Sequence, residues 1–127
     1  MIVLDASAAV LGLLNDGEAR RILGDGTVVC PHLTDSEVVH ALRSMVLRGD
    51  LDADVARRVL AVWGKLGLSR QSVHGLLGRI WELRDNLSAY DATYVALAEA
   101  LDVPLVTADG RLGRATGPRC TISVVRR

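Results

Sequence analysis

Apolar residues lie along this chain in two arrangements, short continuous runs and longer stretches with helical spacing. Continuous apolar runs bounded by turn residues are typical of strands that are buried on both faces of a parallel sheet. They predict strands at residues 2–4, 27–30, 104–107 and 121–125, and a weaker run indicates a brief strand at 66–69.

The stretches between these runs repeat apolar residues every three or four positions, which is typical of amphipathic helices. Ser7, Thr34, Asp52 and Ser88 are residue types that cap helix N-termini, and Gly49 is typical of a helix end. Together they predict helices at residues 8–14, 18–23, 34–48, 52–64, 73–81 and 88–101.

Strand and helix patterns alternate along the chain, which favours a parallel sheet covered by helices on both faces. We therefore expect an α/β fold, a three-layer α/β/α sandwich with a mainly parallel central sheet and residues 2–4 as a central strand. The length of 127 residues and the absence of a repeat or linker predict a single domain over residues 1–127, with 126–127 as a polar tail.

Composition limits the possible partners. The formal net charge is zero, so the whole molecule has no general attraction to nucleic acid or to an anionic membrane. Cys30 and Cys120 form no CxxC pair, which is typical of reduced thiols in the cytoplasm. No leader pattern or membrane-length apolar run is seen, so we expect a soluble, cytoplasmic protein. Trp63 and Trp81 occupy core-like helical positions, which predicts no aromatic platform for base stacking.

Four acidic residues are expected at one edge of the sheet. Asp5 and Asp109 each follow a predicted strand, at the carboxyl end where ligands of such folds gather. Glu37 is predicted in the first turn of the helix after the second strand, and Asp91 in the first turn of the helix before the strand that Asp109 ends. Each acid alone is equally well a turn or capping residue. Four like charges together are unfavourable unless a cation neutralises them, and oxygen ligands favour Mg²⁺ or Mn²⁺.

Four blocks of the sequence resemble those of PIN-domain ribonucleases, and most of all the VapC toxins of bacterial toxin–antitoxin pairs. The blocks are residues 1–8, 36–42, 88–98 and 105–112, and they stand in the family's order over nearly the whole chain. The resemblance implies that Asp5, Glu37, Asp91 and Asp109 are the metal-binding and catalytic acids. Ser7 and Thr107 would be their polar support.

This resemblance also implies a function and partners. The protein would be a Mg²⁺- or Mn²⁺-dependent endoribonuclease that cleaves structured RNA and leaves a 5′-phosphate. It would form a homodimer, act away from membranes, and be held inactive by a cognate antitoxin protein. The alternative is a non-catalytic binding module with the same PIN fold. Neither the target RNA, the number of metal ions nor the role of each acid follows from the sequence.

Overall fold

A five-stranded, wholly parallel sheet forms the centre of the protein, which we describe from a computed structural model covering residues 1–126. The strand order is β3-β2-β1-β4-β5. The strands are β1 Ile2–Leu4, β2 Val28–Pro31, β3 Ser69–Gln71, β4 Leu105–Thr107 and β5 Ile122–Val124. The first strand is therefore central, as predicted, and its residues Val3 and Leu4 are fully buried.

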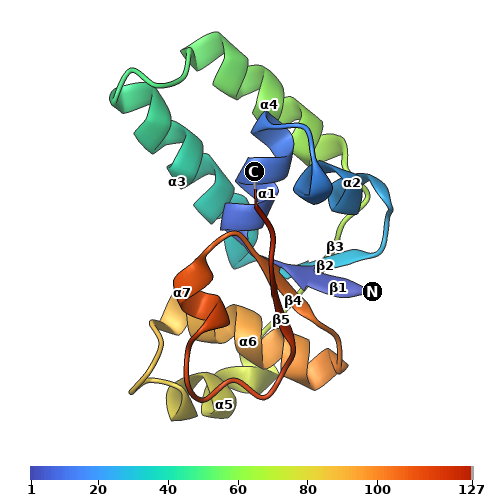
Figure 1. Cartoon of the computed structure of the whole chain (residues 1–127), viewed down its shortest axis with the longest axis vertical. Coiled ribbons are helices and arrows are strands. Elements are labelled where there is room, and N and C mark those ends of the chain that lie inside the picture. The colour runs from blue at the N-terminus through green and yellow to red at the C-terminus, as the bar shows by residue number, and fades with distance from the viewer. Residues whose placement is uncertain (127) are drawn as a thin grey trace.

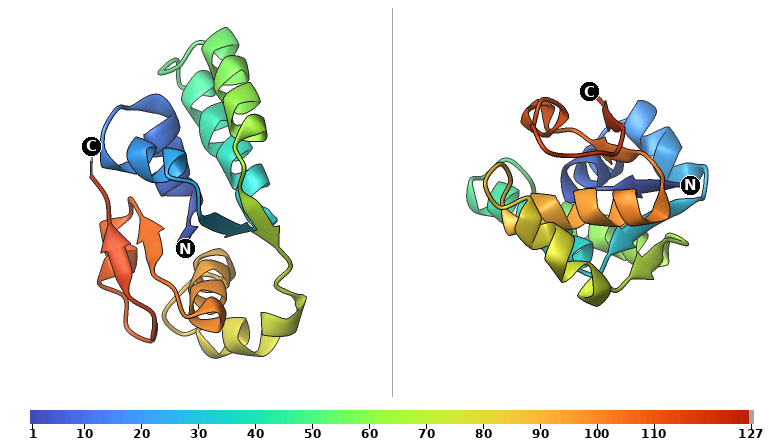
Figure 2. Two further views of the ribbon diagram at one scale, coloured as in Figure 1. Left: turned by 90° about the vertical axis from the view of Figure 1, so that its right-hand side faces the viewer. Right: turned by 90° about the horizontal axis from the view of Figure 1, so that it is seen from below.

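Helices cover both faces of this sheet (Figure 1). Those before β3 are α1 Ala6–Leu14, α2 Glu18–Gly24, α3 Leu33–Leu47 and α4 Ala53–Lys65, and they pack around one apolar cluster. On the other face, a short 3-10 turn at His74–Leu76 leads into α5 Leu77–Glu82, α6 Ala89–Leu101 and α7 Gly110–Gly113 around a second cluster. In the left view of Figure 2, the sheet lies between the two helical layers. The three-layer α/β/α fold is thus confirmed.

Several helix boundaries differ from those predicted. Asp5, not Ser7, is the N-cap of α1, since its carboxylate accepts a hydrogen bond from Ala8 N at 3.0 Å. Helix α3 begins at Leu33, and Thr34 is fully buried inside it instead of capping it. The weak strand lies at Ser69–Gln71, where it pairs with β2, and it overlaps the predicted run of residues 66–69 only at Ser69.

The second helical layer departs further from the amphipathic pattern. Helix α6 is buried at each of the consecutive residues 92–98, because it lies between the sheet and α5. Trp81 of α5, expected in the core, is 67% exposed, whereas Trp63 of α4 is buried as predicted. Arg127, half of the predicted polar tail, lies outside the described residues. Among the described residues, no helix has the length and apolar composition that a bilayer span requires.

Candidate functional site

Asp5 lies at the carboxyl end of the central strand and is almost completely buried. The parallel register pairs Leu4 with Val106, which brings Thr107 beside Asp5. The Asp5 Oδ2 atom accepts a hydrogen bond from the Thr107 hydroxyl at 2.5 Å, and Oδ1 accepts from the Ser7 hydroxyl at 2.7 Å. Burial raises the pKa of Asp5 above its ordinary value, and the hydrogen bonds from Thr107 and Ser7 offset only part of that rise. The ionised form of this carboxylate is therefore less stable here than in water.

Ser7 and Thr107 connect Asp5 to the loop after β4. The Ser7 Oγ atom accepts a hydrogen bond from Ala108 N at 2.9 Å, and Thr107 Oγ1 accepts from Asp109 N at 3.0 Å. The two hydroxyl oxygens lie 3.2 Å apart. These contacts fix the Asp5 carboxylate relative to Asp109, which is the arrangement that polar supporting residues would provide.

Glu37 approaches the same face from α3. Glu37 was predicted in the first turn of this helix. Because α3 begins at Leu33, Glu37 instead lies in the second turn. Its Oε1 atom accepts a hydrogen bond of 2.5 Å from the hydroxyl of Tyr94, which is buried in α6. Burial raises the pKa of Glu37, and the nearby charges of Asp5 and Asp91 raise it further. The sequence offered no sign of this role for Tyr94, since helical spacing does not reveal where its hydroxyl points.

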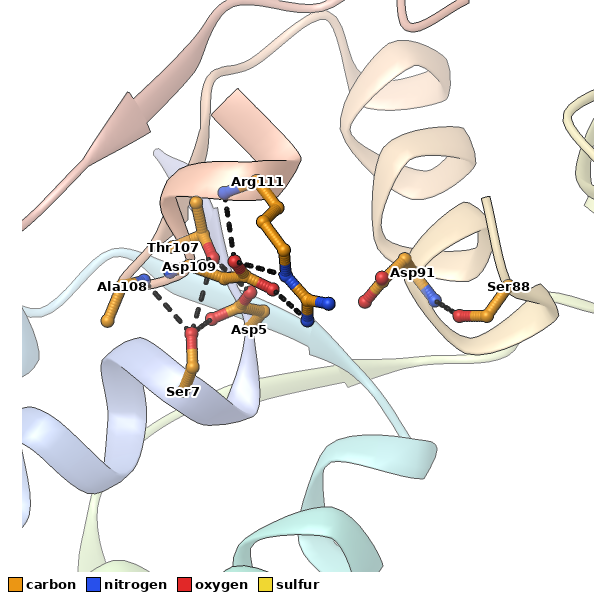
Figure 3. Close-up of polar contacts among 8 residues, drawn as sticks. All are labelled: Asp5, Ser7, Ser88, Asp91, Thr107, Ala108, Asp109 and Arg111. Carbon is orange, nitrogen blue, oxygen red and sulfur yellow. Dashed lines mark hydrogen bonds and ion pairs between the residues drawn. The ribbon is translucent and has the colours of Figure 1, made fainter. Parts of the chain in front are cut away.

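Asp91 and Asp109 face each other across an arginine that the sequence prediction did not consider (Figure 3). Ser88 caps α6 by accepting a hydrogen bond from Asp91 N at 3.1 Å, which leaves the Asp91 carboxylate directed toward the site. Asp109 caps α7 by accepting from Arg111 N at 2.9 Å. The Arg111 guanidinium lies 3.1 Å from Asp109 Oδ2 and points toward Asp91.

The two carboxylates have opposite electrostatic environments. Hydrogen bonding to Arg111 holds the pKa of Asp109 below its ordinary value. Burial, followed by the charge of Asp109, raises the pKa of Asp91. The positively charged guanidinium of Arg111 therefore lies between Asp91 and Asp109, although the surrounding segments contain few basic residues.

Comparison with known proteins assigns this arrangement to a family. The model of the PIN domain matches residues 2–118. The chain belongs to the PIN-domain family. Its relatives include Ribonuclease VapC9 of Mycobacterium tuberculosis, 53% identical over 127 residues that make up 100% of both chains. Ribonuclease VapC1 of the same species is 42% identical over 130 residues, covering 98% of this chain and 97% of the relative. This PIN-domain protein is therefore of the VapC type.

Solved structures share the PIN fold. PAE2754 from Pyrobaculum aerophilum superposes with a TM-score of 0.72 at 26% identity, covering 97% of this chain and 83% of that chain. A toxin–antitoxin complex from Klebsiella pneumoniae contains a chain that superposes with a TM-score of 0.68 at 15% identity, covering 100% of both.

PIN-domain nucleases of the VapC type generally depend on a divalent metal ion. Within residues 1–126, no three acidic, histidine or cysteine side chains stand close enough together, as they lie, to ligate one ion. The donor chemistry nevertheless fits a hard cation, because Asp5, Glu37 and Asp91 offer carboxylate oxygens, and the raised pKa of each is one that a bound cation would lower. The four acids thus lie on one face of the protein, but their side chains are not arranged around a common metal position. Their roles as metal ligands stay a prediction.

Proposed function

We propose that this chain, a VapC-type toxin endoribonuclease, hydrolyses RNA at the face that carries Asp5, Glu37 and Asp91, with Mg²⁺ or Mn²⁺ as its cofactor. One observation carries the proposal: three acids from the end of β1, from α3 and from α6 lie close enough that the charge of Asp91 raises the pKa of Asp5, and the charges of both raise the pKa of Glu37. A fold gains no stability from such an arrangement, since the mutual repulsion opposes folding.

The acids would divide the chemistry between them. A divalent ion bound here would activate a water molecule and stabilise negative charge on the cleaved phosphate. Asp5 and Asp91 would bind the ion directly, since both carboxylates face the site and Asp5 is fixed by Ser7 and Thr107. Glu37 would accept the proton of the attacking water, because its pKa is raised and Tyr94 holds only one of its oxygens. Asp109 would complete the metal site once Arg111 turns away.

Cleavage by the purified protein tests this function. We expect wild type to cut cellular RNA internally in Mg²⁺ or Mn²⁺, to stop when EDTA is added, and to leave 5′-phosphate ends. Asp5→Asn should abolish cutting. Asp25→Asn is the matched control, because Asp25 is an exposed residue at the far end of α2 and should leave the rate unchanged. RNA binding without cleavage under all these conditions would favour the non-catalytic binding module instead.

A second surface suits the antitoxin that VapC-type toxins accompany. A hollow of about 250 Å³ lies between α3 and α4, and its apolar floor includes Leu42, Val46 and Leu60. Arg43 and Arg57 also line it, and Leu47 beside them is 67% exposed. We propose that an amphipathic antitoxin helix with acidic residues along its edges binds there. The protein would also form a homodimer, act in the cytoplasm and have no membrane partner.

Leu47→Glu is expected to weaken binding of the antitoxin by roughly 30-fold, because a charge would then be buried at a central apolar contact. RNA cleavage by the free toxin should be unchanged. The measurement is titration calorimetry with the product of the neighbouring reading frame, and light scattering on the same samples reports the dimer. Val62→Glu is the control, since Val62 is also exposed on α4 but lines a different hollow. Equal weakening by both variants would reject this binding surface.

A further inference from the structure

A second concavity adjoins the acidic face on the side of Glu37. It has a volume of about 590 Å³, within the range of small-molecule sites. Its lining consists of the site residues Ser7 and Glu37 together with Ala6, Ser36, His40, Ala41 and Tyr90, and we call it the Tyr90 pocket. The hollow that contains Asp91, Asp109 and Arg111 shares none of these residues. The acids are therefore flanked by two different surfaces.

Tyr90 is the notable residue of this pocket. It directly precedes Asp91, and its side chain is 61% exposed. The other exposed aromatic residue, Trp81, is covered by the Arg84 guanidinium, which lies 4.6 Å from the ring centroid. Within residues 1–126, no such cation lies over Tyr90, so its ring is available to a ligand. The sequence analysis considered only the two tryptophans as a possible platform for base stacking and left out Tyr90, whose ring is exposed.

The Tyr90 pocket and the hollow lined by Arg111 differ in charge, and so they favour different parts of a nucleotide. Glu37 places negative charge in the Tyr90 pocket, which disfavours a phosphate there, whereas Arg111 on the other side attracts phosphate. The alanine methyl groups and the Tyr90 ring offer apolar contact to a flat, uncharged group. Ser36 and His40 at the same pocket carry hydrogen-bonding groups that can reach the edge of such a group.

We propose that the Tyr90 pocket binds the base of the nucleotide next to the cleaved phosphate, by stacking on the Tyr90 ring. This rests on the RNA-cleaving function proposed above and names a subsite of that same site. The pocket continues directly into the acidic face, because Ser7 and Glu37 belong to both. A phosphate held by the metal ion proposed at Asp5 and Asp91 would bring the neighbouring base to the Tyr90 pocket. Ser36 and His40 would then set any preference among the four bases.

Comparing the binding of RNA with and without its bases distinguishes stacking of a base on Tyr90 from attraction to the sugar–phosphate backbone. The probes are fluorescein-labelled eight-nucleotide oligomers of adenylate and of uridylate, and an abasic oligomer with the same sugar–phosphate backbone. The full-length Asp91→Asn protein, which is expected to lose metal binding and cleavage, is used so that the RNA stays intact and base contacts are measured apart from metal binding. Base stacking on one aromatic residue predicts that the better oligomer binds between about 5-fold and about 150-fold more tightly than the abasic one.

Three further variants in this background assign the preference to Tyr90. Tyr90→Ala should bring the ratio of the two dissociation constants close to one, while Tyr90→Phe should keep it because the ring remains. Trp81→Ala is the matched control and should keep the full ratio, since Trp81 lies on α5 outside the pocket. Tyr90 is exposed, so all variants should melt at the same temperature, which excludes misfolding as a cause.

Defined outcomes overturn the proposal. A ratio near one in the parent protein, or an unchanged ratio in Tyr90→Ala, rejects the base subsite while leaving the nuclease function intact. Loss of only dimer formation or antitoxin binding in Tyr90→Ala assigns this face to a protein partner and also rejects it. If wild type cleaves no RNA and the Asp91→Asn protein binds no oligomer, the nuclease function fails and the subsite fails with it.

Discussion

Asp91→Asn is expected to abolish both RNA cleavage and stabilisation by Mn²⁺, while the metal-free protein becomes as stable as wild type or more so. The physical reason is that burial and the charge of Asp109 raise the pKa of Asp91, so the ionised carboxylate opposes folding when no metal is bound. At a hundred times the dissociation constant, bound metal should raise the wild-type melting temperature by roughly 10 °C. The measurement is thermal melting of both proteins in EDTA and in increasing Mn²⁺.

The pH dependence gives the same prediction a second readout. An acid whose pKa is raised in the folded state binds its proton more tightly there than in the unfolded chain. Its contribution therefore makes stability fall as pH rises from about 4 through the folded pKa. Asp5, Glu37 and Asp91 all have this direction of shift. Metal-free wild type should thus lose stability over this rise in pH, and Asp91→Asn should lose less.

Ser88→Ala is the matched control, because Ser88 caps the same helix without belonging to the acid group. It should lower stability by about 1 kcal/mol and leave the Mn²⁺ response intact. If Asp91→Asn instead behaves like Ser88→Ala, with a lower melting temperature and no change in the response to metal, then Asp91 is only a capping residue.

The sheet was predictable from sequence because its central strands are buried on both faces. Val3, Val29 and Leu105 form continuous apolar runs for that reason, and such runs have few other interpretations. The connection rules then bring the carboxyl ends of β1, β2 and β4 to one edge. This is why the placement of Asp5 and Asp109 at the same edge followed from the pattern alone.

Details of the helices and side chains depended on tertiary contacts. Thr34 has the residue type of a cap, yet the packing of α3 buries it and the helix begins one residue earlier. Trp81 has core-like spacing, but α5 is only 6 residues long and leaves it in solvent. Neither the hydrogen bond from Tyr94 to Glu37 nor the position of Arg111 leaves a periodic signal in the sequence.

Asp35 was absent from the sequence prediction, yet it connects two helices of the first helical layer with the edge strand β3. Its Oδ1 atom accepts a hydrogen bond from the buried Trp63 indole at 2.8 Å. Both its oxygens accept from the Arg70 guanidinium, at 2.7 and 2.8 Å. The contacts join α3, α4 and β3, and so they hold the helices that form the proposed antitoxin hollow.

Asp35→Ala is expected to lower the free energy of unfolding by about 2 kcal/mol at pH 7, because the buried Trp63 indole N–H then lacks its partner. The ion pair with Arg70 adds less, since the Asp35 side chain is 41% exposed and water screens it. Asp35→Asn should lose less than the alanine variant, because its amide oxygen still accepts from Trp63. Asp54→Ala is the control and should lose little, since the pair of Asp54 and Arg57 is exposed.

The pH dependence of these variants identifies the charged part of the effect. Hydrogen bonding to Arg70, followed by that to Trp63, holds the pKa of Asp35 below its ordinary value. A lowered folded pKa contributes stability that is fully present above the unfolded pKa of about 4 and is lost as pH falls through the folded pKa. Urea unfolding should therefore show wild type more stable than Asp35→Asn at pH 7, with the two converging below the folded pKa, where both carry an uncharged side chain. A difference of equal size at both pH values would mean that the Asp35 charge contributes nothing and that shape alone holds α3 to α4.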